Sequence, residues 1–175
     1  MPDPAHLDTV GELTAALRDL GLQPILVGGM AMVVLGSRRI TRDFDFVVAA
    51  PGDRLTDVIS VFYSLRLELV SRLDVHGDVA ATIANRRVAV SRLRIDRPET
   101  ASFYDPRTGL CVDLLFDCPI AASSLAKRAS RIRVGKHQLH VADERDLLEL
   151  KRIAAAARRS PGDADDIAFL ERRLS

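Results

Sequence analysis

The segment at positions 24–48 constrains the fold most, because it fixes two strands and a helix around two glycines and two aspartates. A short apolar run predicts a buried strand, and Gly28 and Gly29 follow it directly and open a short helix. After a loop, Asp43 and Asp45 begin a second apolar strand. The order strand, glycine pair, helix, loop and Asp-x-Asp strand is more specific than either motif alone.

The two aspartates are predicted to lie side by side. Alternate residues of a strand project to the same face, so Asp43 and Asp45 share one face while Phe44 and Phe46 point to the other. The phenylalanines belong in the core, which leaves the carboxylate face open. Neighbouring carboxylates repel each other, and a divalent cation relieves that repulsion. Hard oxygen ligands of this kind suit Mg²⁺, with phosphate oxygens and water completing the coordination.

The glycine pair is suited to a phosphate. A helix that begins directly after a strand presents unpaired backbone N–H groups at the positive end of its dipole. Because Gly28 and Gly29 have no side chains, a phosphate can approach that backbone closely. Two acids beside a phosphate site predict phosphoryl or nucleotidyl transfer.

This pattern resembles the nucleotidyltransferase superfamily, whose best-known fold is that of DNA polymerase β, and among its branches the AbiEii-type proteins, which include bacterial toxins. The resembling segments are GGMAMVVLGSRRITRDFDFVV at 28–48 and ADERDLLELKRIAAAARRSPGDADDIAFL at 142–170. The resemblance implies an α/β (α+β) fold, with a mixed β-sheet flanked by helices and a C-terminal helical pair. It also implies three metal-binding acids, two Mg²⁺ ions and a nucleoside triphosphate as donor.

The resemblance assigns Asp43 and Asp45 to the metal and calls for a third acid on a neighbouring strand. Asp113 is the candidate, because a lone aspartate inside the apolar run 110–116 is costly unless it is paired or bound to a cation. It is expected to act as general base on the acceptor hydroxyl, and Asp117 is the fallback. Met30 stands where many relatives carry serine, so donor binding would rest on the backbone and on a set of polar side chains: Ser37, Arg38 or Arg39, with Arg42.

Lys151 lies on the apolar stripe of a helix predicted at 143–159. A lysine in such a stripe often extends its ammonium group to the surface. The resembling relatives have a lysine here that reaches the nucleotide phosphates, which favours a phosphate contact. Asp163 and Asp166 are expected to cap the last helix, predicted at 163–174, and to bond to its neighbour.

The predicted activity is Mg²⁺-dependent transfer of a nucleoside monophosphate from a triphosphate to a hydroxyl. The AbiEii-like resemblance implies an RNA acceptor, the 3′ end of tRNA foremost, and a cognate antitoxin as partner. Two basic groups favour RNA: Arg86, Arg87, Arg92, Arg94 and Arg97, and Lys127, Arg128, Arg131, Arg133 and Lys136. An antibiotic-type, small-molecule acceptor is the alternative within this class. A non-catalytic binding module is the alternative outside it, and Met30 favours that reading.

Composition sets the remaining limits. The chain has 175 residues and a net charge of +1, with 47% apolar residues, which predicts a single domain with a core at 1–141 and C-terminal helices at 142–175. No apolar run is long enough to span a membrane, and no signal region precedes the first helix. Cys111 and Cys118 are expected to be reduced thiols, in a cytoplasmic protein.

The other predicted elements follow from periodicity and from Gly and Pro positions. Helices are expected at 4–20, 54–65 and 119–128, and the two C-terminal helices are separated at Ser160-Pro161-Gly162. Strands are expected at 67–73 and 131–141, and a hairpin is expected from strands at 79–83 and 88–95.

Overall fold

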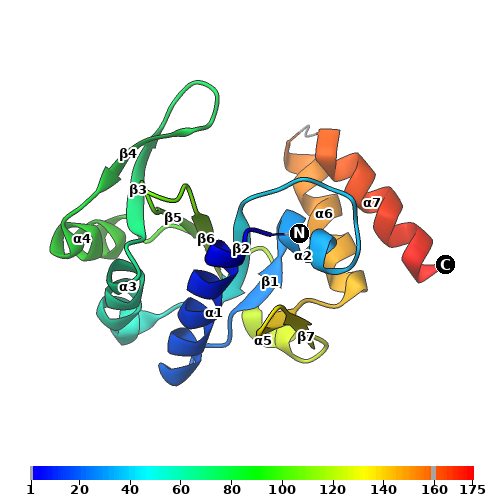
Figure 1. Ribbon diagram of the computed structural model, residues 1–175, viewed down its shortest axis with the longest axis horizontal. Coiled ribbons are helices and arrows are strands. Elements are labelled where there is room, and N and C mark those ends of the chain that lie inside the picture. The colour runs from blue at the N-terminus through cyan, green and yellow to red at the C-terminus, as the bar shows by residue number, and fades with distance from the viewer. Residues whose placement is uncertain (1, 159–160) are drawn as a thin grey trace.

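The computed structural model describes residues 2–158 and 161–175 and contains one mixed sheet of eight strands (Figure 1). The strand order is β4-β3-β5-β6-β2-β1-β8-β7. The strands are β1 (Ile25–Val27), β2 (Phe44–Val48), β3 (Glu68–Leu73), β4 (Val79–Ile83), β5 (Thr100–Tyr104), β6 (Cys111–Phe116), β7 (Ser130–Val134) and β8 (His137–Val141). Parallel pairing joins β2 to β6 and β1 to β8, and the other neighbours are antiparallel.

Seven α-helices and one 3-10 helix accompany the sheet in the described part of the chain. They are α1 (Pro4–Asp19), α2 (Gly28–Val34), η1 (Gly52–Arg54), α3 (Leu55–Ser64), α4 (Arg86–Asp96), α5 (Ala122–Ala126), α6 (Glu144–Ala157) and α7 (Pro161–Leu174). The helix predicted at 143–159 forms α6. Its predicted last residue, Arg159, and Ser160 of the predicted break lie outside the described residues. None of the helices within residues 2–158 and 161–175 has the length and apolar character needed to cross a membrane.

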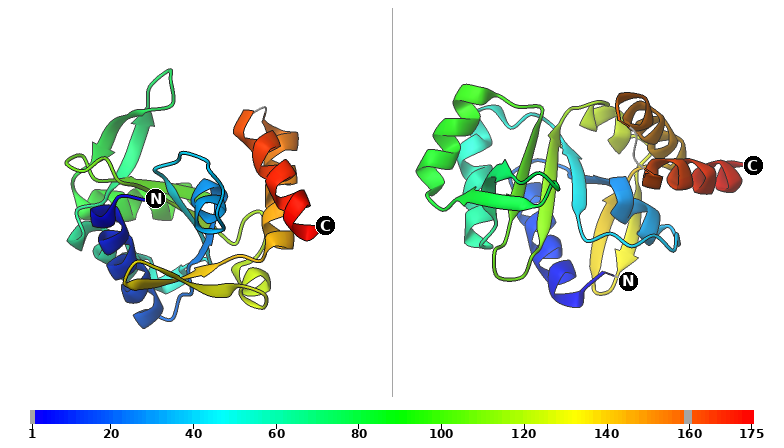
Figure 2. Two further views of the ribbon diagram at one scale, coloured as in Figure 1. Left: turned by 45° about the vertical axis from the view of Figure 1, so that its right-hand side comes forward. Right: turned by 90° about the horizontal axis from the view of Figure 1, so that it is seen from above.

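Two pairs of helices lie at the two ends of the long axis, whereas α1, α2 and α5 lie between them (Figure 1). Figure 1 shows α3 and α4 with the β3–β4 hairpin at one end and α6 with α7 at the other. In the left view of Figure 2, the β3–β4 hairpin and the α6–α7 pair stand on opposite sides of the molecule, with the segment around α2 between them. The middle strands of the sheet, β5, β6, β2 and β1, lie between these two groups of elements.

The apolar core confirms the predicted orientation of the second strand. Phe44 and Phe46 of β2 are 1% and 0% exposed, so their face of the strand is the buried one. On the same side of the sheet, Phe103 of β5 stacks on Phe62 of α3 with ring centroids 3.9 Å apart. This packing leaves the face that bears Asp45 turned away from the core.

Two predicted elements need correction, and one strand is missing from the prediction. The run 88–95 is a helix, because Asn85 caps it by accepting hydrogen bonds from the N–H groups of Arg87 and Val88, and it forms α4 instead of the second strand of a hairpin. The run 131–141 is two strands, β7 and β8, which turn at Gly135 with φ of +62°. Strand β5 was not predicted, although its Thr-Ala-Ser-Phe-Tyr sequence alternates in burial as a half-buried strand does.

Candidate active site

Two of the predicted acids face each other across the parallel pair β2–β6. Asp45 is the register partner of Asp113, so their side chains share the open face of the sheet. Asp43 lies two residues before Asp45, at the start of the same strand. The structure therefore brings together the three carboxylates that the sequence selected from positions about 70 residues apart.

The electrostatics of these acids reflect their crowding. Burial, followed by the charges of Asp113 and Asp43, raises the pKa of Asp45 to about 7. Burial and the charge of Asp113 also raise the pKa of Asp43, although Arg39 partly offsets this. The ionised form of this cluster is therefore strained in the absence of a cation, which is the condition that a divalent ion relieves.

Gly28 is required by two independent features. Its φ of +68° lies in the left-handed region that side-chain-bearing residues rarely adopt. A Cβ at this position would also overlap the carboxylate of Asp45, because Val27 is the register partner of Asp45 on β2. At Gly29 a Cβ would lie 3.0 Å from Nε of Arg39. The glycine pair thus makes room for an acid and for a guanidinium.

These groups line one cavity of about 520 Å³. Seven residues selected from the sequence are on its wall: Gly28, Gly29, Arg39, Asp43, Asp45, Asp113 and Lys151. The wall also includes Thr41 of the loop before β2, Thr100 and Ser102 of β5, and apolar residues of α6. The cavity has room for a nucleotide-sized molecule.

Lys151 is buried in an ion cluster that joins α6 to α7. Its Nζ lies 3.1 Å from Oδ1 of Asp163 and 2.7 Å from Oδ2 of Asp166. Asp166 also pairs with Arg39, so one buried carboxylate holds two of the three cations of the cavity wall, the third being Arg158. The predicted bonding of Asp163 and Asp166 to the neighbouring helix is confirmed, but the prediction that they cap the last helix is wrong, because α7 begins at Pro161 and both residues lie inside it. The ammonium of Lys151 does not extend to the surface.

The predicted donor residues outside this cavity fall in different places. Ser37 and Arg38 line a neighbouring cavity against α7, and the hydroxyl of Ser37 accepts a hydrogen bond from the backbone N–H of Arg39. Arg42 is exposed and belongs to the lining of neither cavity. Arg39 is the loop arginine on the acid cavity, and its ion pair with Asp166 spans 127 residues of sequence, which no local pattern could reveal.

Two other positions have structural roles. Met30 is 1% exposed and packs in the core, so the position that holds serine in many relatives contributes apolar packing here. Asp117, the fallback for the third acid, follows β6 with φ of +51°. Its carboxylate accepts hydrogen bonds from the backbone N–H groups of Ala50 and Ala122, and it does not line the acid cavity. Asp113 is therefore the acid that the site offers.

The acids fit Mg²⁺ as a partial ligand set. In the parts of the chain that the structure describes, no three His, Cys, Asp or Glu side chains are placed so that together they could hold a metal ion. Mg²⁺ does not require three such side chains, because it is usually held by one or two carboxylates together with water and substrate phosphates. Asp45 and Asp113, in register on adjacent strands, provide that number of carboxylates, with Asp43 beside them.

Comparison with known proteins identifies the fold. No protein-family model matches the chain, and no curated protein matches its sequence. Among solved structures, the chain is similar to ANT(2'')-Ia bound to adenylyl-2''-tobramycin, with a TM-score of 0.65 and 11% identity over 98% of this chain and 90% of that chain. It is similar to the lincosamide antibiotic adenylyltransferase LnuA, with a TM-score of 0.60 and 12% identity over 97% of each chain.

A third similar structure is an antigenic nucleotidyltransferase-like protein from Paracoccidioides brasiliensis, with a TM-score of 0.60 and 16% identity over 97% of this chain and 77% of that chain. At these identities the likeness concerns the fold. The chain therefore has the fold of nucleotidyltransferases, as the mixed sheet and its acid pair already indicated.

Proposed function

We propose that the chain is a metal-dependent nucleotidyltransferase. The observation that carries the proposal is the facing of Asp45 and Asp113 across β2 and β6 beside the side-chain-free backbone at Gly28, within one cavity. The fold shared with two antibiotic-modifying adenylyltransferases supports it. Asp45 and Asp113, with Asp43 beside them, would hold Mg²⁺, which would neutralise phosphate charge when bound.

Each group on the cavity wall then has a task. Arg39 and Lys151, held by Asp166, lie on the α6 side of the acids and bind the triphosphate. Asp113 accepts the proton of the acceptor hydroxyl. The acceptor oxygen forms a bond to the α-phosphorus, and the bond from that phosphorus to the oxygen bridging to the β-phosphate breaks. Pyrophosphate leaves with the electron pair. Catalysis is positioning and charge stabilisation, because such displacement requires little covalent chemistry from the protein.

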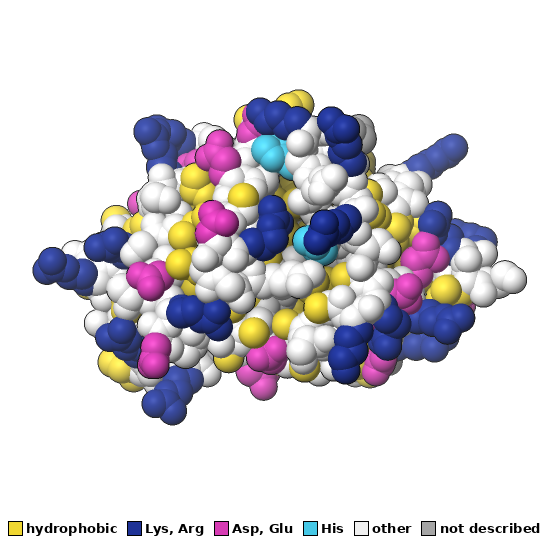
Figure 3. Space-filling view, turned by 90° about the horizontal axis from the view of Figure 1, so that it is seen from below, with side chains coloured by type: hydrophobic (Ala, Val, Ile, Leu, Met, Phe, Trp, Pro, Cys, Tyr) yellow, Lys and Arg dark blue, Asp and Glu magenta, His cyan; other side chains and the backbone are white. Residues whose placement is uncertain are grey.

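The acceptor has two candidate classes. The AbiEii-like resemblance favours an RNA, such as the 3′ end of tRNA, with a cognate antitoxin as partner. Several of the basic side chains that favoured RNA are paired within the protein: Arg92 with Asp96, Arg128 with Asp146 and Lys136 with Asp8. Figure 3 shows one face of the molecule, on which Lys and Arg side chains are spread among acidic and apolar ones. A small-molecule acceptor is therefore the candidate that this surface favours.

Calorimetric titration with ATP, CTP, GTP and UTP, with and without Mg²⁺, tests the proposal. We expect binding of at least one triphosphate that requires the metal and that Asp45→Ala abolishes. Asp57→Asn is the matched control, because Asp57 is exposed on α3 and does not line the cavity. Binding that survives Asp45→Ala would instead identify a non-catalytic module, and absence of any metal-dependent binding would refute the proposal.

A further inference from the structure

Strand β5 extends the acid site on the side opposite the glycine pair. Ser102 is the register partner of Asp113, and Thr100 is the register partner of Leu115, so both hydroxyls share the open face with the acids. Across the sheet the order is β1, which Gly28 of α2 directly follows, then β2 with Asp45, β6 with Asp113 and β5 with Ser102. The acid pair therefore separates the proposed triphosphate site from the hydroxyls of β5.

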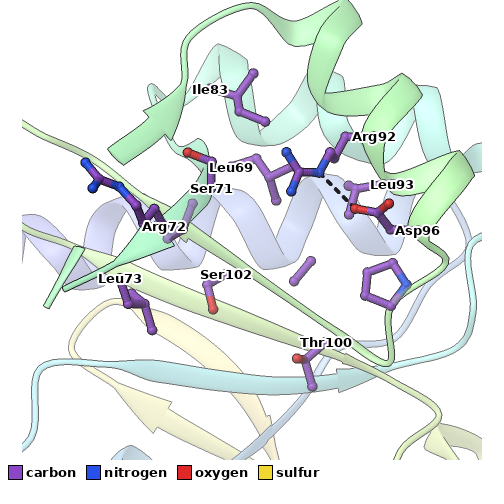
Figure 4. Close-up of a pocket in the computed structure, with 13 residues that line it drawn as sticks. Leu69, Ser71, Arg72, Leu73, Ile83, Arg92, Leu93, Asp96, Thr100 and Ser102 are labelled. Atoms are coloured by element: carbon purple, nitrogen blue, oxygen red, sulfur yellow. Dashed lines mark hydrogen bonds and ion pairs between the residues drawn. The ribbon is translucent and has the colours of Figure 1, made fainter. Parts of the chain in front are cut away.

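Beyond β5 the sheet opens. Within the described residues, β3 pairs with β5 at two positions, Glu68 with Tyr104 and Leu69 with Phe103. The rest of β3 pairs only with β4, and the register of that pairing is irregular around Arg72. This part of β3 therefore diverges from β5. A pocket of about 280 Å³ lies at this opening, between β3, β5 and α4 (Figure 4). Thr100 and Ser102 line both this pocket and the acid cavity, so the two spaces adjoin at these two residues.

The lining of this pocket indicates what it can bind. Its apolar wall includes Leu69, Leu73, Ile83 and Leu93, and Leu73 is 54% exposed. One of its two arginines, Arg92, is paired with Asp96 at 2.8 Å, as Figure 4 shows. None of the 13 lining residues, all of which are described, is aromatic. Recognition of an unpaired RNA base usually depends on an aromatic or guanidinium stacking surface beside a continuous basic path.

We infer that the pocket between β3, β5 and α4 binds the non-reacting part of the acceptor, and that the acceptor is a small hydroxyl-bearing molecule with an apolar body. This inference rests on the proposed function. In-line displacement places the acceptor oxygen opposite the leaving pyrophosphate. With the triphosphate on the side of Gly28 and Lys151, the acceptor approaches from β5, where Ser102 and Thr100 hydrogen-bond its polar groups and the pocket takes its apolar part.

A pocket-blocking variant tests the inference. Ser71 is exposed on β3 and lines the pocket, so Ser71→Trp fills it, and Leu73→Trp is a second variant of the same design. Ala80→Trp is the matched control, because Ala80 is exposed on the adjacent strand β4 and does not line the pocket. Each protein is incubated with Mg²⁺, an α-labelled triphosphate, and either the dialysable fraction of source-cell extract or total RNA from the same cells.

We expect label in a dialysable product. Ser71→Trp should reduce that transfer about tenfold or more, because displacing a reactant by about 1 Å costs up to about a hundredfold. Triphosphate binding and Tm should stay unchanged, and Ala80→Trp should resemble the unaltered protein. Label in RNA, no label in any product despite metal-dependent triphosphate binding, or equal transfer by Ser71→Trp and Leu73→Trp would each overturn the inference. If the unaltered protein binds no triphosphate in the presence of Mg²⁺, the proposed function itself is refuted.

Discussion

The carboxyl group of Asp45 is expected to destabilise the metal-free protein at neutral pH. An unfolded aspartate has a pKa near 3.9, whereas Asp45 in the folded chain has a pKa of about 7. Between these values the folded state binds more protons than the unfolded state, so stability falls as pH rises from about 4 to 7. Asp45→Asn removes this penalty and should raise the free energy of unfolding by roughly 2–4 kcal/mol at pH 8.

Urea denaturation at pH 4 and at pH 8, both in EDTA, measures this effect. The gain from Asp45→Asn should be present at pH 8 and small at pH 4, where Asp45 is protonated in the folded state and about half protonated in the unfolded state. Asp57→Asn, at an exposed position on α3, should change stability little at either pH. An Asp45→Asn protein less stable than the unaltered chain at pH 8 would show that the carboxylate is not strained.

Gly28 should be irreplaceable for a reason beyond its backbone conformation. Gly28→Ala introduces both a positive-φ alanine and an overlap with the Asp45 carboxylate. Gly36→Ala is the matched control, because Gly36 has φ of +98° but nothing within 4 Å of an added Cβ. Both variants should lose about 1–2 kcal/mol of stability from the backbone alone. Only Gly28→Ala should also lose metal-dependent triphosphate binding in calorimetry, and equal binding by both variants would contradict the assigned contact.

At the scale of single residues, the sequence predicts those parts of the cavity wall that depend on local pattern. The alternation of Asp43, Phe44, Asp45 and Phe46 determines which face is open, and the structure confirms it. Arg39 is different. Its place on the cavity wall depends on a carboxylate of α7, so no spacing within the loop distinguishes it from Arg38 or Arg42.

At the scale of elements, the ion cluster around Lys151 is expected to hold α7 against α6. The side chains of Lys151 and its two aspartates are 9% and 2% exposed, so Lys151→Met leaves two buried carboxylates with one cation fewer. Removing one partner of a buried ion pair costs about 3–5 kcal/mol. We expect a loss of that size in urea denaturation and faster amide hydrogen exchange in α7.

Arg152→Met provides the comparison on the same two helices. Arg152 pairs with Glu171 of α7 at 2.8 Å, but the two side chains are 60% and 51% exposed. Exposed pairs contribute about 0–1 kcal/mol because water and salt screen them. If Arg152→Met loosens α7 as much as Lys151→Met does, burial is not what makes the cluster strong.

The sequence pattern predicted the wrong type for one element and missed another. In α4 the run Val88-Ala89-Val90 suggests a strand by its β-branched alternation, yet the Asn85 cap and the burial of Ala89, Val90 and Leu93 on one helical face make it a helix. Strand β5 is short and follows this helix closely, so its boundaries depend on pairing with β6. The side of the cavity that carries Ser102 could not be predicted for that reason.

At the scale of the whole molecule, the order of the strands explains why distant segments make one site. The strands β1, β2, β6 and β5 lie next to one another although β6 follows β2 by more than 60 residues. The end of β1 leads into the glycine backbone of α2, β2 and β6 each contribute a carboxylate, and β5 contributes hydroxyls. On one side of this row, α6 contributes Lys151, and Asp166 of α7 holds both Lys151 and Arg39 of the loop before β2. On the other side, β3 and α4 border a pocket.

This arrangement predicts that metal and triphosphate stabilise the protein together. The metal relieves repulsion among the acids, and the phosphates bridge the metal to Arg39 and Lys151, so each ligand strengthens binding of the other. At roughly 100 times the dissociation constant, a ligand specific for the folded state raises Tm by about 5–10 °C for a chain of this size. Asp113→Asn should fold with an unchanged or higher Tm but lose that rise. Thermal melts with Mg²⁺ alone, triphosphate in EDTA, and both together measure it, and an equal rise in EDTA would mean that the acids do not hold a cation beside the nucleotide.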